Sequence, residues 1–214
     1  PSSDTGTTTG TETNTDPGTN PGTDSGSDSG NIQDLTDRED IPKVPNGDYM
    51  PVISQLNTGA EGLDSSQRNM PDGMKKAIKE LVNQLPKQFT TCTVGINYTP
   101  TTSANEAFSS EGYVFVTNNS WFAPSFVDLD EATRIKRFKE ILLREMTNCY
   151  LYYYGSKITD WRKEIGNSII TNAEAKTDIL ESTVLYYEDP DYLNSLKPSK
   201  RSFIENKILS GKIN

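Results

Sequence analysis

The residues from about Leu129 to Tyr153 are expected to form a single long helix. Apolar side chains recur at helical spacing along this stretch, at Ile135, Phe138, Ile141, Leu142, Met146 and Cys149. Asp128 or Asp130 can cap the start of the helix, and Gly155 can end it. We therefore expect this to be the central helix, with one face buried along its length.

Shorter elements are expected on both sides of the central helix. Apolar residues at helical spacing predict helices over residues 74–85, 173–187 and 199–209, and a short element is expected to start at Asp189. Alternation of apolar and polar residues predicts strands over 89–98 and 112–117, separated by a loop. This order predicts an α+β fold with a small sheet confined to the N-terminal half.

Composition divides the chain into three parts. Residues 1–30 are almost wholly Thr, Gly, Ser, Asp, Asn and Pro, without a basic or large apolar side chain. Such a stretch cannot bury enough surface to offset the entropy of ordering, so it is expected to be a disordered tether. Residues 31–72 read as an extended lead-in that packs on the domain, and residues 73–214 as the domain itself.

Two classes of partner are disfavoured by composition. The formal net charge is −9, and no basic stripe with interleaved aromatic residues is present, which argues against nucleic acid. No apolar run approaches the length of a membrane-spanning helix.

Within the central helix, the sequence Leu-Leu-Arg-Glu-Met-Thr-Asn-Cys (residues 142–149) resembles the active-site helix of a zinc peptidase, in which two histidines flank Glu-x-x. Arg144 and Asn148 stand at the two histidine positions, and the whole chain contains no histidine. A guanidinium does not bind zinc, and an Asn amide oxygen is a poor substitute for imidazole.

A second match lies in the C-terminal part. This segment resembles the third-ligand helix of the gluzincins related to anthrax lethal factor and the clostridial pro-Pro endopeptidases. It consists of residues 172–182, the sequence Val-Leu-Tyr-Tyr at 184–187, and Asp189-Pro190. It also resembles the zinc-metallohydrolase lipoproteins that accompany Sus-type importers of Bacteroidota. The resemblance implies a zincin-like domain with a helical C-terminal lobe.

The resemblance also assigns positions. The first ligand falls on Arg144, the general base on Glu145, the second ligand on Asn148, the third ligand on Thr177 and an outer carboxylate on Glu181. Because all three ligands are replaced, the resemblance implies a pseudoenzyme that binds no metal or other cofactor, with Glu145 and Glu181 as remnants of a catalytic site.

Two readings of Arg144 stay open. Its charge can stand where the metal would be and neutralise Glu181, Asp178 or Glu145, or its side chain can point to solvent. Glu145 itself is expected to pair with a cation in the old cavity. The alternative function is a metal-independent hydrolase in which Glu145 works with Glu181 or Asp178 as a carboxylate pair.

A ligand cleft is expected below the strand over residues 112–117, where open backbone groups can align an extended peptide. Its expected lining is Arg144, Asn148, Thr177, Asp178, Tyr113 and Trp121. The aromatic residues around Trp121 and Tyr150–Tyr154 can serve a peptide or glycan ligand, or can be core packing. A third reading is a purely structural interaction protein whose cleft is filled.

Cys92 and Cys149 are the only cysteines. In an exported protein they can form one bridge, and equally both can be small buried core residues.

The expected cellular setting follows from the tether and the resemblance. The chain begins at Pro1 with a low-complexity stretch, which is typical of a mature bacterial surface lipoprotein whose anchor precedes it. The resemblance implies an outer-membrane, cell-surface location through an N-terminal lipid anchor, and an accessory role for a TonB-dependent nutrient importer and its surface lipoprotein. A secreted or periplasmic protein is the alternative.

Overall fold

The computed structural model describes residues 50–56, 61–101, 104–165 and 169–210. By its internal contacts the chain divides into Pro1–Asn31 and Ile32–Asn214, and every described residue belongs to the second unit. The expected tether and the first part of the expected lead-in, residues 1–49, lie outside the described residues.

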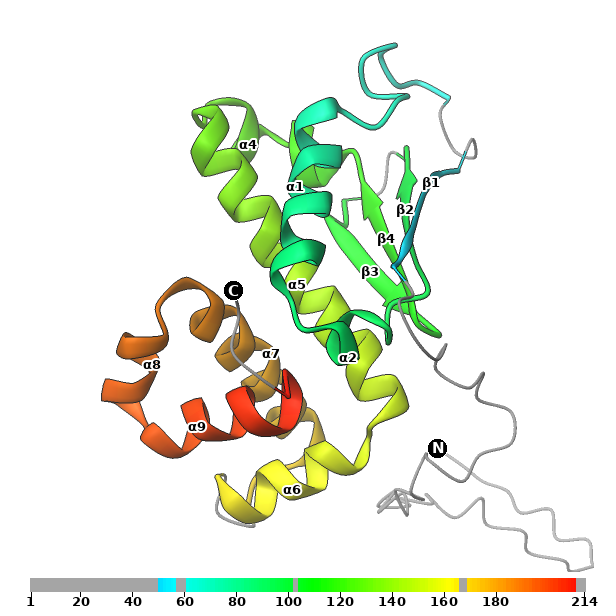
Figure 1. Cartoon of the computed structure of the whole chain (residues 1–214). Coiled ribbons are helices and arrows are strands. Elements are labelled where there is room, and N and C mark those ends of the chain that lie inside the picture. The colour runs from blue at the N-terminus through cyan, green and yellow to red at the C-terminus, as the bar shows by residue number, and fades with distance from the viewer. Residues whose placement is uncertain (1–49, 57–60, 102–103, 166–168, 211–214) are drawn as a thin grey trace, which may run out of the picture. The chain divides into compact units, whose positions relative to one another are not determined.

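The described part is a mixed α+β fold, in which a small sheet and one long helix precede a group of shorter helices (Figure 1). The elements in chain order are β1 (Val52–Gln55), α1 (Asp72–Gln84), α2 (Lys87–Thr90), β2 (Gly95–Thr99), β3 (Ala107–Ser110), β4 (Tyr113–Thr117), α3 (Asn119–Phe122), α4 (Pro124–Val127), α5 (Glu131–Tyr153), α6 (Ser156–Glu164), α7 (Asn172–Glu188), α8 (Pro190–Leu196), α9 (Pro198–Phe203) and the π-helical turn η2 (Ile204–Ile208). None of the described helices is long and apolar enough to cross a membrane.

The sheet has the order β1-β2-β4-β3, in which β1, β2 and β4 are parallel and β3 is antiparallel to β4. Side chains alternate between its two faces. On the face that packs on the helices, Ile96, Tyr98, Val114 and Val116 are fully buried, whereas Ala107 and Ser109 of β3 are partly buried. β3 therefore forms one edge of the sheet, and β4 lies inside it.

Two sequence predictions about the sheet were wrong, and one strand was not predicted. Residues 99–111 were expected to be a loop, but they contain the edge strand β3. The strand expected over 89–98 is only Gly95–Thr99, because Pro86 opens the helical turn α2 instead. The lead-in also supplies a strand of its own, β1.

A two-residue turn joins β3 to β4. Glu111 and Gly112 both have positive φ, 51° and 81°, as a type I′ hairpin turn requires. Gly112 also lies against the ring of Tyr153, near the end of α5. A Cβ added at Gly112 would lie 2.5 Å from the Tyr153 hydroxyl oxygen. The turn thus needs glycine for both its backbone conformation and its close contact with α5.

The long helix α5 confirms the expected central helix, with slightly different ends. The Asp130 side chain caps it by accepting a hydrogen bond from the Thr133 N–H at 3.0 Å. The helix ends at Tyr153, and Gly155 instead precedes α6. Its buried side chains, among them Phe138, Leu142 and Met146, join the single core cluster that also includes residues of the sheet, α1 and α7.

Helices α5 and α7 are joined by side-chain ion pairs. Lys136 near the start of α5 contacts Glu188 at the end of α7, at 2.8 Å. Farther along α5, Arg144 contacts Glu181, which precedes Glu188 on α7. The two helices therefore run in opposite directions, so that the second half of α5 faces the first half of α7.

Cys92 and Cys149 are both buried free thiols in this structure. Burial raises the pKa of each thiol to about 12. Both residues belong to the core cluster, which is the second of the two readings given by the sequence.

Candidate functional site

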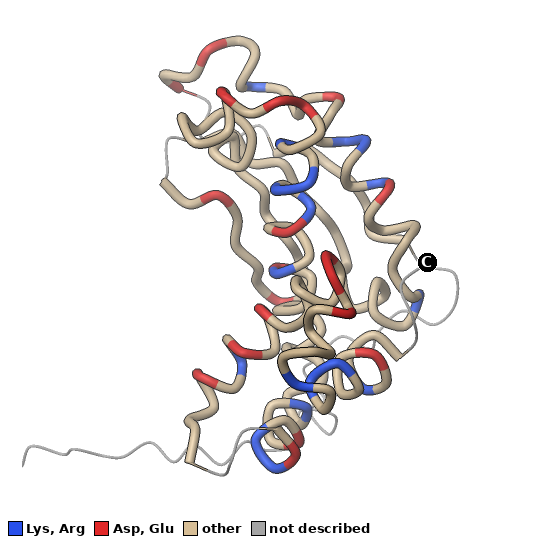
Figure 2. Tube along the Cα trace, turned by 90° about the vertical axis from the view of Figure 1, so that its left-hand side faces the viewer, with Lys and Arg blue, Asp and Glu red and all other residues tan. Residues whose placement is uncertain are grey.

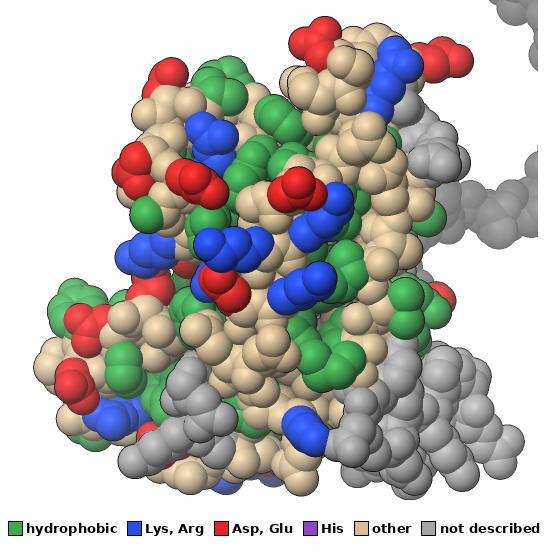
Figure 3. Space-filling model, turned by 45° about the horizontal axis from the view of Figure 1, so that its top comes forward, with side chains coloured by type: hydrophobic (Ala, Val, Ile, Leu, Met, Phe, Trp, Pro, Cys, Tyr) green, Lys and Arg blue, Asp and Glu red, His purple; other side chains and the backbone are tan. Residues whose placement is uncertain are grey.

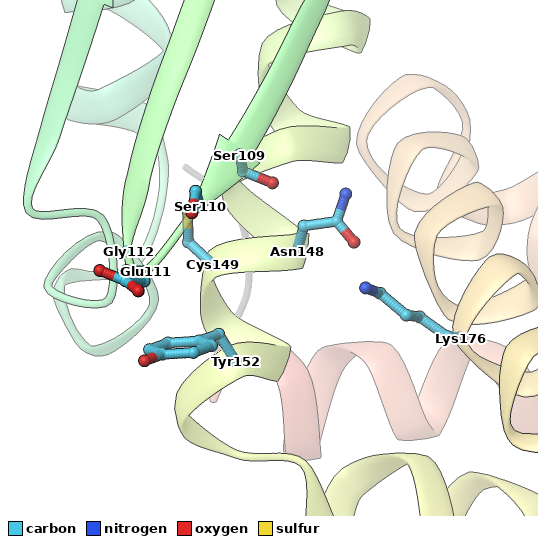
Figure 4. Close-up of a pocket in the computed structure, with 8 residues that line it drawn as sticks. All are labelled: Ser109, Ser110, Glu111, Gly112, Asn148, Cys149, Tyr152 and Lys176. Atoms are coloured by element: carbon cyan, nitrogen blue, oxygen red, sulfur yellow. The ribbon is translucent and has the colours of Figure 1, made fainter. Parts of the chain in front are cut away.

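The edge strand β3 and helix α5 enclose a groove with two hollows. One, of about 280 Å³, is lined by Ala104, Asn105, Glu106, Ala107, Ile141, Arg144 and Glu145. The other, of about 250 Å³, is lined by Ser109, Ser110, Glu111, Gly112, Asn148, Cys149, Tyr152 and Lys176 (Figure 4). The lining residues follow one another along both elements, so we treat the two hollows as one site and call it the β3–α5 groove.

Glu145 lies between the two hollows and has neutral hydrogen-bond donors as its neighbours. Its Oε2 accepts from Ser109 Oγ on β3 at 2.6 Å and from Asn148 Nδ2 at 3.2 Å, one turn farther along α5. The expectation that Glu145 pairs with a cation is therefore wrong. Two neutral donors stabilise the carboxylate instead, and they fix β3 against α5 at this point.

Arg144 neutralises Glu181, as one of the two readings of the sequence expected. Its Nη2 donates to Glu181 Oε2 at 2.9 Å, and both side chains are substantially exposed, at 40% and 57%. The Nε of Arg144 is buried and has no hydrogen-bond partner among the described residues. The guanidinium thus ties α5 to α7 and leaves one donor toward the groove.

Asn148 presents its oxygen to the second hollow. Its Nδ2 donates a hydrogen bond to Glu145, and its Oδ1 is buried without a hydrogen-bond partner within the described part of the chain. Figure 4 shows the Lys176 side chain reaching from α7 toward the Asn148 amide. The hollow therefore contains an unused acceptor beside an ammonium group.

Thr177 and Asp178 were expected to line the cleft, but neither lines a hollow of the β3–α5 groove. Thr177 is exposed, and its hydroxyl donates to the Ala173 carbonyl at 3.1 Å. Asp178 accepts from Trp161 Nε1 at 3.1 Å and from the Lys200 ammonium. Asp178 therefore holds α7 to α6 and α9.

Tyr113 and Trp121 also lie outside the groove. Tyr113 projects from the sheet face opposite α5 and lies beside Phe115, with ring centroids 6.5 Å apart. Trp121 is 6% exposed and packs edge-on against Phe138 of α5. For Trp121 the core-packing reading of the aromatic residues is confirmed, and the same holds for the buried Tyr150, Tyr153 and Trp161.

Two groove residues, Ser109 and Lys176, were missed by sequence reasoning. Ser109 lies in the stretch that was expected to be a loop, so its approach to Glu145 was not foreseen. Lys176 directly precedes the position assigned to the third ligand. Residues one apart on a helix project about 100° away from each other, so the position assigned to Thr177 gave no signal for Lys176.

The residues at the assigned ligand positions do not fit a zinc ion. Zinc takes thiolate, imidazole and carboxylate ligands, and these positions supply a guanidinium, an amide and a hydroxyl. Arg144 and Thr177 are also engaged elsewhere, with Glu181 and the Ala173 carbonyl. Across the described ranges, no three His, Cys, Asp or Glu side chains are grouped so that they could hold a metal ion.

The carboxylates of the alternative hydrolase are each engaged by other side chains. Glu145 is held by Ser109 and Asn148, Glu181 by Arg144, and Asp178 by Trp161 and Lys200. A pair of catalytic carboxyl groups must face one bond of a substrate from two sides. The contacts of these three residues give each a different structural partner instead.

The outer edge of β3 has unused backbone groups. In an antiparallel pair, residues whose backbone N–H and C=O groups bond to the partner strand alternate with residues whose backbone groups point away from it. The bond from Thr117 N to Glu106 O, at 3.0 Å, sets this alternation. The N–H and C=O groups of Ala107 and Ser109 therefore point away from β4, and they have no partner in the parts of the chain that are described.

Charges of both signs are mixed over the described surface. Figure 2 shows Lys and Arg interspersed with Asp and Glu along the helices, and the face in Figure 3 likewise mixes both signs. Ion pairs such as Lys139–Glu80, at 2.8 Å, contribute to this pattern. A continuous basic surface, which binding to a phosphate backbone requires, is not seen in either view.

No family model, curated protein or solved structure matches the chain.

Proposed function

We propose that this chain is a catalytically inactive, zincin-like binding module that holds an extended polypeptide segment against β3. Three features support the zincin-like part of the proposal. A long helix lies beside an antiparallel edge strand, a glutamate of that helix lies in the groove between them, and an antiparallel helix follows at the expected distance in sequence. The residues at the ligand positions, described above, support the loss of metal chemistry.

The open edge of β3 is the observation that carries the binding function. Ala107 and Ser109 offer two N–H and two C=O groups along a strand that borders a hollow groove. An exposed strand edge is a template for pairing with another extended segment, and the pockets beside it take up alternate side chains. The proposed ligand is therefore an extended segment of a partner protein or peptide.

The cellular part of the proposal rests on the sequence resemblance. In that setting the chain is a surface lipoprotein of the bacterial outer membrane, tethered through its Thr/Gly/Ser/Asp-rich first 30 residues. Its partner is then a TonB-dependent Sus-type importer with its surface lipoprotein, for which this chain is an accessory subunit.

A pull-down from solubilised outer membranes of the native organism tests the proposal, with Ala107→Pro as the critical variant. Proline removes the N–H of Ala107 and blocks pairing along β3. The control is Glu131→Pro, because residue 131 is the first of α5, where a free N–H is not needed. Circular dichroism is used to confirm that both variants are folded.

We expect the unaltered chain and Glu131→Pro to retain a stoichiometric partner that Ala107→Pro loses, and the eluate to contain far less than one zinc ion per chain. A partner that Ala107→Pro still retains would show that binding occurs away from β3. One zinc per chain would refute the loss of metal chemistry.

A further inference from the structure

The second hollow of the β3–α5 groove has a defined pair of polar groups. Asn148 Oδ1 is a buried acceptor without a partner, and the Lys176 ammonium points toward it from α7 (Figure 4). Within the described ranges, the Lys176 side chain has neither an ion pair nor a hydrogen bond. Glu111 also lines the hollow, but its carboxylate points away from Lys176 (Figure 4).

The orientation of Asn148 is fixed by its neighbour. Its Nδ2 donates to the Glu145 carboxylate, which also accepts a hydrogen bond from the Ser109 hydroxyl. Turning the amide over would place its oxygen against a carboxylate oxygen, which repels it. The hollow therefore presents an acceptor from Asn148 and a donor from Lys176, side by side.

A ligand group must offer both a donor and an acceptor to satisfy this pair. A carboxylate accepts from Lys176 but meets the Asn148 oxygen without a proton to donate. An ammonium donates to Asn148 but is repelled by Lys176. A side-chain carboxamide carries an NH₂ and a C=O in one plane, so it matches both groups at once.

The register of strand pairing places one side chain in this hollow. The Ser109 side chain points toward Glu145 on α5, and its backbone groups point outward along the open edge of β3. Directly opposed residues on neighbouring strands project to the same face. A ligand residue opposite Ser109 therefore directs its side chain toward α5 and into the hollow.

From these contacts we infer that the hollow between Ser109, Asn148 and Lys176 selects an Asn or Gln side chain on the peptide that pairs with β3. The inference rests on the proposed function, because the register requires strand pairing. Cys149 and Tyr152 also line the hollow.

Amide NMR of the full chain, titrated with end-blocked peptides Thr-Val-Thr-X-Thr-Val-Thr, tests the inference. X is Gln, Leu, Glu or Lys, and the Ala107 and Ser109 amides report on pairing. Two added hydrogen bonds are worth about 5- to 150-fold in affinity, so the Gln peptide should bind that much more tightly than the Leu peptide. The Glu and Lys peptides should each bind more weakly than the Gln peptide.

Lys176→Met should lower the affinity for the Gln peptide toward that for the Leu peptide, and leave the affinity for the Leu peptide unchanged. Lys79→Met is the matched control, since Lys79 is an exposed lysine of α1. It should change neither affinity.

The outcomes separate this inference from the proposed function. Equal affinities for Gln and Leu, or tighter binding of Glu, would overturn the carboxamide selection and leave strand pairing in place. No shift at Ala107 or Ser109 with any peptide would overturn both. A shift at Asn148 with maltohexaose but with no peptide would assign the hollow to a glycan and overturn both as well.

Discussion

At the scale of single residues, the hydrogen bonds of Glu145 connect a strand to a helix. Here the Ser109 hydroxyl and the Asn148 amide both donate to the same oxygen of Glu145. The carboxylate therefore joins the strand wall of the groove to its helix wall, and it also fixes the direction in which the Asn148 oxygen points.

Arg144 is expected to contribute little to stability, although the sequence resemblance assigns it to a ligand position. Both side chains of its ion pair with Glu181 are exposed to solvent. Exposed ion pairs stabilise a fold by about 0.2–1 kcal/mol. We predict a coupling energy below about 1 kcal/mol in a double-mutant cycle of Arg144→Met and Glu181→Gln, measured by urea unfolding.

The Lys207–Glu164 pair is the matched control for that cycle, because both of its side chains are similarly exposed. The two cycles should agree within error. A coupling energy of about 3 kcal/mol or more for the Arg144 pair alone would mean that the guanidinium acts as a buried structural centre.

Gly112 in the β3–β4 turn can be compared with Gly62, which has nearly the same φ. Their φ values are 81° and 80°, but a Cβ at Gly62 would have nothing within 4 Å, whereas at Gly112 it would meet the Tyr153 side chain. We predict that Gly62→Ala costs about 1–2 kcal/mol and that Gly112→Ala costs about 1–3 kcal/mol more. Thermal unfolding measures both; equal costs would show that the Tyr153 contact adjusts freely.

At the scale of elements, the α5–α7 pair includes two carboxyl groups that share a hydrogen bond. Burial, followed by the hydrogen bond to Glu188, raises the pKa of Glu140 to about 7 from an ordinary value of 4.5. The hydrogen bond from Glu140, together with Lys136, lowers the pKa of Glu188. Between about pH 4.5 and 7 the pair therefore holds one proton, on Glu140.

The shift predicts how stability varies with pH. Between about pH 4.5 and 7 the folded chain keeps a proton on Glu140 that the unfolded chain releases, so stability falls as pH rises through this window. Because Gln donates the same hydrogen bond at any pH, Glu140→Gln should be more stable than the unaltered chain at pH 8, by about 1 kcal/mol, but not at pH 5. The lowered pKa of Glu188 acts below pH 4.5, outside this window.

Thermal unfolding at pH 5 and pH 8 checks this prediction. Glu61→Gln, at an exposed site before α1, serves as the control and should leave the pH dependence unchanged. If Glu140→Gln and the unaltered chain show the same difference between pH 5 and pH 8, the raised pKa is wrong.

The elements also show what the sequence could and could not predict. The helices over α1, α5 and α7 follow from apolar periodicity and lie within two residues of the expected ends. β3 was missed because Ala-Phe-Ser-Ser has few apolar residues, as an edge strand often does, and because Glu-Gly is a weaker turn signal than Asn-Gly. The Glu145–Ser109 contact was unpredictable for the same reason, since it depends on β3.

At the scale of the whole described domain, one core joins the sheet to the C-terminal helices. Phe203 of α9 is 3% exposed and packs edge-on against Trp161 of α6, with ring centroids 5.0 Å apart. We predict that Phe203→Ala costs about 3–5 kcal/mol and lowers one cooperative transition. Leu196→Ala, at a residue of α8 that is 58% exposed, should cost less than about 0.5 kcal/mol.

Near- and far-ultraviolet circular dichroism measure that transition through different structural signals. Coincident curves for the unaltered chain and for Phe203→Ala would confirm a single unit. If the helical signal is lost before the aromatic signal of the core, the C-terminal helices unfold separately from the sheet.

The two walls of the β3–α5 groove differ in how firmly they are built. One is a helix of 23 residues packed into the core, and the other is a strand of four residues with a neighbour on one side only. Amide hydrogens exchange slowly in core helices and quickly at unpaired edges. A ligand in the groove should therefore slow amide exchange mainly at Ala107 and Ser109. Exchange in α5 should stay the same, so the exchange rates of β3 report whether the groove is occupied.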